Sequence, residues 1–214
     1  MRNRFNEQLA ELNIEIIEMG SMCEEIIENA VMSLNNADIS LAQGVKVSGI
    51  SIDQMERDIE SRCMKLLLHQ QPVASDFRLI SAALKMITDM ERIGDQAEDI
   101  ADIVTFLGGR TVSEMKLISE MSYKAIEMVT ASVDAFVNKD IILAENVIEQ
   151  DDIVDNYFAD IKSNIINWIA NNPEDGEFAL DLLMIAKYLE RIGDHATNIA
   201  EWVIFSVTGI HKEG

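Results

Sequence analysis

Positive charge is scarce in this chain. Its 214 residues include 17 Lys and Arg against 38 Asp and Glu, so the formal net charge is −21. Such an excess of negative charge repels the phosphate backbones of DNA and RNA, which excludes nucleic acid as a partner. Cations and the basic surfaces of other proteins are the partners that it attracts. Solvation of the surface alone also explains much of the charge.

Long apolar runs and paired cysteines are missing as well. The longest stretch without a charged residue is the eleven residues 163–173, which is too short to cross a bilayer. The first residues, MRNRFNEQLAELN, lack the apolar segment of a signal peptide. Cys23 and Cys63 form no C-x-x-C motif, and we expect both to be small buried side chains in a reducing compartment. We therefore expect a cytoplasmic protein without membrane insertion.

Proline and aromatic residues are also few. Pro72 and Pro173 are the only prolines, and aromatic residues make up 6% of the chain. Long segments rich in Glu, Leu, Ile, Ala and Met favour helices, and apolar residues recur at helical spacing from Met86 to Val104. No segment shows a convincing alternation of apolar and polar residues, so the sequence predicts an all-α fold.

The sequence contains an internal duplication. The segment ERIGDQAEDIA at 91–101 returns ninety-nine residues later as ERIGDHATNIA, with eight of eleven positions identical. The segment NADISLAQGV at 36–45 returns 102 residues later as NKDIILAENV, with six of ten identical. Repetition on this scale indicates one structural unit present twice. We predict two domains of the same design, residues 1–109 and 110–214.

Two kinds of break divide each half into helices, and a pair of glycines ends the first half. Asn-Ala-Asp at 36–38 and Asn-Lys-Asp at 138–140 are turn formers that also provide N-caps. Pro72 and Pro173 lie in the second break of each half, and Gly108 with Gly109 ends the first half. The predicted helices are 3–35, 38–69, 76–106, 112–137, 140–171 and 176–206. Short connections make neighbours antiparallel, so we expect six long helices in two similar three-helix bundles.

Acidic side chains converge in the second half. Glu190 and Asp194 are four residues apart and share one face of a helix. In an antiparallel pair centred on the turn before Pro173, Asp155 lies opposite Glu190, and Asp151 lies opposite Asp194. Four carboxylates at one level repel one another unless a cation neutralises them. The glycine within each ERIGD segment costs about 1 kcal/mol of helix stability, which we attribute to close approach of a neighbouring helix.

The first half repeats this arrangement with one acid fewer. Asp53 lies opposite Glu91, but Gly49 stands opposite Asp95, so we expect this site to bind a cation more weakly. Oxygen-only ligands suit Mg²⁺, Mn²⁺ or iron, with zinc also open. Glu25 and Glu127 fall at about the same level and are considered as additional ligands. The predicted metal ligands are Asp53, Glu91, Asp95, Asp151, Asp155, Glu190 and Asp194. The alternative is that these acids form solvated helix faces and hold no ion.

No catalytic motif accompanies the carboxylates. His69, His195 and His211 are too scattered for a zinc site of ordinary spacing, and His195 is expected at the surface or the rim of the cluster. The sequence has no Ser-His-Asp motif, no glycine-rich phosphate loop and no Glu-x-x-His pair. Arg92 and Arg191 are expected to pair with the aspartates three residues later. We predict a protein that is not an enzyme; the alternative is a metal-dependent hydrolase or redox enzyme that uses the same carboxylate clusters.

The chain resembles a known bacterial family. The segments IDQMERDIESRC at 52–63 and QQPVASDFR at 70–78, followed by the paired ERIGD helices, are similar to PhoU, a family of phosphate-signalling regulators. The resemblance covers nearly the whole chain and implies two three-helix bundles. It also implies metal binding through E(D)xxxD motifs, which match Glu91 with Asp95, Asp151 with Asp155, and Glu190 with Asp194. Gly49 departs from the motif ahead of Asp53.

The resemblance also implies a function. PhoU-like proteins lie between the ATPase subunit of the phosphate ABC transporter and a sensor histidine kinase in the membrane. They restrain phosphate uptake and the phosphate-starvation response, and members are commonly homodimers. On this basis we expect a cytoplasmic negative regulator of phosphate homeostasis.

Overall fold

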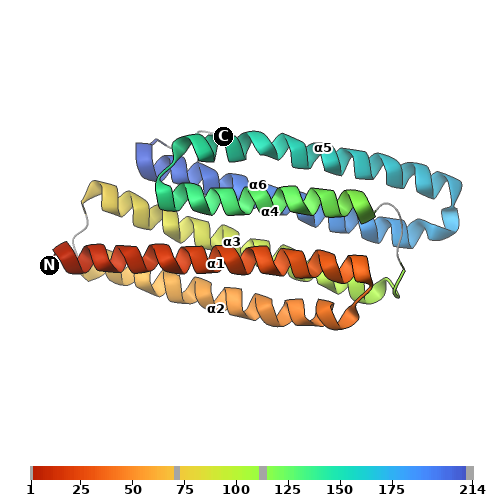
Figure 1. The fold of residues 1–214 in the computed structure, drawn as a ribbon, viewed down its shortest axis with the longest axis horizontal. Coiled ribbons are helices and arrows are strands. Elements are labelled where there is room, and N and C mark those ends of the chain that lie inside the picture. The colour runs from red at the N-terminus through yellow and green to blue at the C-terminus, as the bar shows by residue number, and fades with distance from the viewer. Residues whose placement is uncertain (1, 70–72, 111–114, 211–214) are drawn as a thin grey trace.

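The fold is all-α. The computed structural model describes residues 2–69, 73–110 and 115–210. This part of the chain forms six α-helices and one 3-10 helix, and it contains no strand. No described helix combines the length and the apolar character that crossing a membrane requires. The elements are α1 (Arg2–Asn36), α2 (Ile39–His69), α3 (Ala74–Phe106), α4 (Met115–Asn138), α5 (Ile141–Asn171), η1 (Pro173–Asp175) and α6 (Gly176–Thr208) (Figure 1).

The first break of each half has the same local structure. Asp38 caps α2 by accepting a hydrogen bond from the N–H of Leu41 at 3.0 Å, and Asp140 caps α5 in the same way from Leu143 at 3.1 Å. The residue before each cap, Ala37 or Lys139, has a positive φ of 53° or 55°. Both predicted turns and both predicted caps are therefore confirmed, and each reverses the chain between antiparallel helices.

The other helix ends follow the predicted breaks. Gly108 and Gly109, with φ of 62° and 79°, end α3 in the left-handed conformation that glycine adopts without strain. Pro173 opens the 3-10 helix between α5 and α6. Pro72 and the predicted start of the fourth helix at residue 112 lie outside the described residues.

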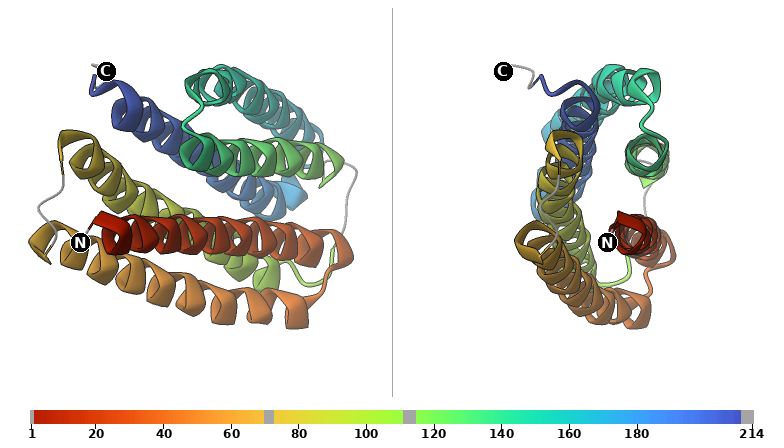
Figure 2. Two further views of the ribbon diagram at one scale, coloured as in Figure 1. Left: turned by 60° about the vertical axis from the view of Figure 1, so that its left-hand side comes forward. Right: turned by 90° about the vertical axis from the view of Figure 1, so that its left-hand side faces the viewer.

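The six helices form two layers. Seen end on, α2, α3, α6 and α5 make one curved layer, and α1 and α4 lie against its concave side (Figure 2, right). Each half is a three-helix bundle, and the halves meet where α3 contacts α6 and α1 contacts α4. The repeated ERIGD helices α3 and α6 are thus neighbours at the centre of the curved layer.

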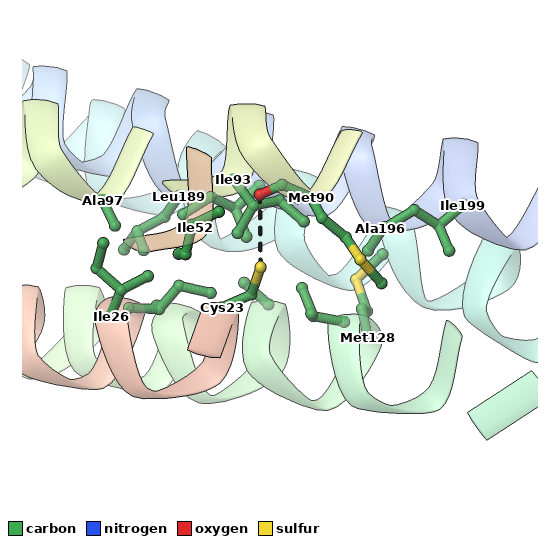
Figure 3. Close-up of a cluster of buried hydrophobic side chains, with 14 of the residues drawn as sticks. Cys23, Ile26, Ile52, Met90, Ile93, Ala97, Met128, Leu189, Ala196 and Ile199 are labelled. Atoms are coloured by element: carbon green, nitrogen blue, oxygen red, sulfur yellow. Dashed lines mark hydrogen bonds between the residues drawn. The ribbon is translucent and has the colours of Figure 1, made fainter. Parts of the chain in front are cut away.

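A single apolar core runs through both halves. Figure 3 shows Cys23, Met90 and Ile93 of the first half in one cluster of buried side chains with Met128, Leu189 and Ala196 of the second half. The Cys23 thiol donates a hydrogen bond to the carbonyl oxygen of Met90 at 3.4 Å. Cys23 and Cys63 are fully buried free thiols, as predicted. Because Met90 and Ile93 face this core, Glu91 and Asp95 project from a different part of the α3 surface.

Candidate metal centre

Two glycines let the helices that carry the acidic residues approach closely. A Cβ atom on Gly94 of α3 would lie 3.2 Å from Cδ1 of Ile52 on α2. A Cβ atom on Gly193 of α6 would lie 3.3 Å from Cγ1 of Val154 on α5. Both distances are tighter than ordinary side-chain contacts, which confirms the reason predicted for these glycines. Each ERIGD helix is thereby held close to the helix before it, with the acidic residues of both on one side.

Three carboxylates meet in the first half. Asp53 of α2 and Glu91 and Asp95 of α3 each offer an oxygen atom, and these three atoms lie within 4.8 Å of one another. Asp53 and Glu91 are half-buried, whereas Asp95 is exposed. The antiparallel register of α2 and α3 therefore brings together the three acids predicted for this half.

Two carboxylates of this cluster, those of Glu91 and Asp95, resist ionisation. Burial, and then the negative charge of Asp95, raises the pKa of Glu91 above its ordinary value. The pKa of Asp95 is raised in the same direction by burial and then by the charge of Asp53. Arg92 acts in the opposite sense on both groups, as expected for a neighbour on the same helix. Without a cation, the cluster is thus electrostatically unfavourable.

A further acid stands beside this cluster. Burial, followed by the charges of Asp95 and Asp53, raises the pKa of Glu98. Glu98 lies on α3 next to Gly49 of α2, the position at which the first half lacks an acid. Glu98 was not among the predicted ligands, because the repeat has Thr197 at the corresponding place and the duplication therefore carries no signal for it.

The second half brings its four predicted acids into electrostatic contact. Burial, and then the charges of Asp194 and Asp155, raises the pKa of Asp151 from 3.8 to about 6. The pKa of Asp194 is also raised, by burial and then by the charge of Glu190. These couplings place Asp155 and Glu190 beside the other two, in the predicted register. Among the described residues, however, only the first half holds three such groups within 4.8 Å of one another.

A lysine occupies part of the second site. Lys187 of α6 forms an ion pair with Glu190, three residues later on the same helix. The corresponding residue in the first half is Thr88, so no lysine stands at this place in the first cluster. The second site therefore has four acids with one resident positive charge. Lys187 was not among the residues predicted for this site, although its spacing from Glu190 is typical of a helical ion pair.

Both acidic clusters border one cleft between α3 and α6. The cleft has a volume of about 660 Å³. It is lined by four residues from each ERIGD helix: Glu91, Arg92, Asp95, Gln96, Arg191, Asp194, His195 and Asn198. The sequence predicted two separate sites, whereas the structure places them on either side of a shared space.

Polar contacts tie α3 to α6 along this cleft. Nδ1 of His195 lies 2.9 Å from Oδ1 of Asp89, and the amide of Asn198 donates to the same oxygen at 3.2 Å. The side chains of His195 and Asp89 are each only 15% exposed, so His195 is a contact between the halves rather than a free surface residue. Arg191 lowers the pKa of Asp99 on α3, although burial raises that pKa overall.

Glu25 and Glu127, considered as additional ligands, lie elsewhere. Glu25 lines a surface groove with Ser48 and Ser51, and Glu127 forms an ion pair with Lys124 at 2.6 Å. Neither belongs to the cluster of Asp53 and its neighbours.

Residues 16–104 and residues 118–203 each match the family model described as PhoU domain. The chain belongs to the PhoU family. The two matches correspond to the two three-helix bundles, which confirms the internal duplication.

Relatives of the PhoU family match the chain over nearly its full length. It is 35% identical over 210 residues to the phosphate-specific transport system accessory protein PhoU homolog of Clostridium acetobutylicum, covering 97% of this chain and 96% of that one. The crystal structure of PhoU from Pseudomonas aeruginosa is 35% identical, with a TM-score of 0.91 and coverage of 96% and 100%. A crystal structure titled as the phosphate transport system regulatory protein PhoU from Streptococcus pneumoniae is 25% identical, with a TM-score of 0.89 and coverage of 98% and 99%.

The donor sets fit the metal that the family resemblance implies. Oxygen ligands around one divalent ion lie about 3 to 5 Å apart, and the carboxylates of Asp53, Glu91 and Asp95 satisfy this spacing. Carboxylate oxygens suit hard or borderline cations such as Mg²⁺, Mn²⁺ and Fe²⁺. The raised pKa values of Glu91 and Asp95 agree with this, because burial raises both and a bound cation would relieve the repulsion that adds to the effect of burial.

Proposed function

We propose that this protein binds divalent metal ions through two carboxylate clusters. The first would use Asp53, Glu91 and Asp95, and the second would use Asp151, Asp155, Glu190 and Asp194. The observation that carries the proposal is the approach of three carboxylate oxygens from α2 and α3 to within 4.8 Å of one another. A bound ion would hold neighbouring helices together and would neutralise part of the net charge of −21.

Metal titration of the full chain tests this proposal. Mn²⁺ binding is measured by calorimetry for the wild type and for two double variants, Asp53→Asn/Asp95→Asn and Asp151→Asn/Asp194→Asn. Each double variant is expected to lose one class of site, and the thermal midpoint of the wild type is expected to rise with Mn²⁺. A matched control is Asp58→Asn/Asp160→Asn, which removes two exposed acids from the same helices. Wild type and all three variants behaving alike would refute metal binding.

We propose that the protein is a regulator of phosphate transport that works by binding rather than by catalysis. Its relatives carry the name of a phosphate transport accessory protein over nearly the full length of this chain. In this proposal it is cytoplasmic and homodimeric, with a boundary between its domains at residues 109 and 110. It binds the ATPase subunit of the phosphate transporter and restrains a sensor histidine kinase when phosphate is sufficient.

Genetic complementation tests the regulatory proposal separately. A strain that lacks the gene is expected to express a phosphate-starvation reporter in high phosphate, and the wild-type gene should restore repression. Affinity purification from the complemented strain should recover the transporter ATPase. Full repression without the gene would refute negative regulation, whatever metal the protein binds. Turnover of phosphate esters or peroxide by the metal-loaded protein, lost in Glu190→Ala, would instead favour an enzyme.

A further inference from the structure

Gly49 leaves a space that a carboxylate fills from another helix. A Cβ atom placed on Gly49 of α2 would overlap Oε1 of Glu98 on α3 and would lie 2.5 Å from its Cδ. Gly49 itself is buried. The carboxylate of Glu98 therefore occupies the volume in which any side chain at position 49 would begin.

In the second half, the carboxylate comes from the other helix of the pair. There, position 151 holds an aspartate, and the residue that corresponds to Glu98 is Thr197. Thr197 acts to lower the pKa of Asp151, so these two positions also face each other across the helix pair. The pair of α5 and α6 thus combines Asp151 with Thr197, whereas the pair of α2 and α3 combines Gly49 with Glu98. Each pair of positions supplies one carboxylate.

We propose that Glu98 is the fourth carboxylate ligand of the first metal site and replaces the aspartate that Gly49 removes. This inference rests on the proposed metal binding by Asp53, Glu91 and Asp95. A Cβ atom at position 49 would displace the Glu98 carboxylate, so glycine lets this longer side chain from α3 occupy the place of the missing aspartate. The ligand is a divalent cation of the Mg²⁺ or Mn²⁺ class, since all four donors are carboxylate oxygens.

The relative strength of the two sites follows from this assignment. With Glu98 included, both sites have four acids, but only the second contains Lys187 in contact with Glu190. A positive charge at a cation site opposes binding, and Thr88 replaces this lysine in the first half. The first half has a lysine of its own near Glu98, because Lys46, which pairs with Asp102, lowers the pKa of Glu98. With four acids and one nearby lysine each, the two sites are expected to bind a cation about equally, whereas the sequence alone predicts a weaker first site.

A methyl group can displace Glu98 without changing any charge. We would compare Gly49→Ala with Gly44→Ala in full-length protein whose second site is removed by Asp151→Asn/Asp194→Asn. Both changes replace a glycine of α2, but a Cβ atom at Gly44 meets nothing within 4 Å. Gly49→Ala is expected to weaken Mn²⁺ binding about tenfold or more, while Gly44→Ala leaves it unchanged. Thermal unfolding without metal checks that both variants fold.

Removing the charge of Glu98, and exchanging the residues at positions 49 and 98, give a second test in the protein that lacks the second site. Glu98→Gln is expected to weaken Mn²⁺ binding as Gly49→Ala does. Asp102→Asn removes an equal charge one turn further along α3, where Asp102 pairs with Lys46 at 2.6 Å, and should have little effect. The double change Gly49→Asp/Glu98→Thr recreates the arrangement of the second half and is expected to restore binding.

The outcomes separate this inference from the proposed function. If Asp53→Asn abolishes Mn²⁺ binding but Glu98→Gln and Gly49→Ala match their controls, Glu98 is not a ligand and the metal site stands. If the background protein binds no Mn²⁺ and Asp53→Asn changes nothing, both the site and the role of Glu98 are refuted. Weaker binding in Gly49→Ala and Glu98→Gln, with recovery in the exchanged variant, supports the assignment.

Discussion

At the scale of single residues, Asp151 links protonation to stability. Burial and the charges of Asp194 and Asp155 raise its pKa from 3.8 to about 6 in the folded protein. Between these two pH values the folded chain retains a proton that the unfolded chain has lost. The stability contributed by this proton is present at low pH and is lost as the pH rises through about 6. Metal binding has the opposite dependence, because the ligands must release their protons.

The raised pKa of Asp151 predicts how the stability of the metal-free protein depends on pH. Its free energy of unfolding should contain a component that falls between pH 4 and pH 6, and Asp151→Asn should remove that component. The exposed Asp160 on the same helix provides the control, because Asp160→Asn should leave the profile unchanged. Urea unfolding in chelator at several pH values measures the effect. Parallel profiles for the wild type and Asp151→Asn would contradict it.

The two cysteines behave as buried apolar side chains. Burial, the first cause in both cases, raises the pKa of Cys23 and of Cys63 to about 12. A thiol reacts as its thiolate, so both should be unreactive toward Ellman's reagent at pH 8 in the folded protein. Both should react fully in urea. Rapid labelling without denaturant would show that the core opens readily around α1 for Cys23 or around α2 for Cys63.

At the scale of helices, a glycine decides how closely α6 approaches α5. A Cβ atom on Gly193 would already lie 3.3 Å from Val154 and 3.4 Å from a carboxylate oxygen of Asp151. The branched side chain of Gly193→Val should therefore push the helices apart and lower the free energy of unfolding by about 1 to 3 kcal/mol. Gly44→Val meets open space and should not destabilise the protein. Urea denaturation of both variants measures the difference; equal stability would mean that the contact is not tight.

The positions of the helices were largely predictable from local chemistry. Turn residues, N-caps and glycines such as Asp38, Asp140 and Gly108 act within a few residues, so their effects can be read without the fold. The register of α2 against α3 was also predictable, because an antiparallel pair with a short connection has a fixed centre. This register placed Asp53 opposite Glu91 correctly.

The remaining features of the site depend on contacts between distant residues. Nothing in the sequence indicates that α3 and α6 pack together, so the shared cleft and the contact of Asp89 with His195 were not predicted. Glu98 was missed for a related reason. A duplication draws attention to positions that are alike in both halves, whereas the structure shows an acid exchanged between positions 49 and 98.

At the scale of the whole molecule, the two halves share one core and are expected to unfold as one cooperative unit. The apolar core is continuous across both, and α3 and α6 are joined by Asp89, whose carboxylate contacts His195 and Asn198. Structural units that share a core of this kind unfold together. A metal bound on one side of the cleft would therefore stabilise both halves.

Substitution of Asp89 tests this cooperativity. Asp89→Ala removes both hydrogen bonds and should lower the free energy of unfolding by about 1 to 3 kcal/mol. Trp168 and Trp202, the only tryptophans, both lie in the second half, although Asp89 belongs to the first. Tryptophan fluorescence and far-UV circular dichroism should therefore report one coincident transition, shifted equally by the substitution. The exposed Asp160→Ala serves as the control. If Asp89→Ala does not shift the midpoint of the fluorescence transition, the halves unfold independently, because each then draws its stability from its own three helices.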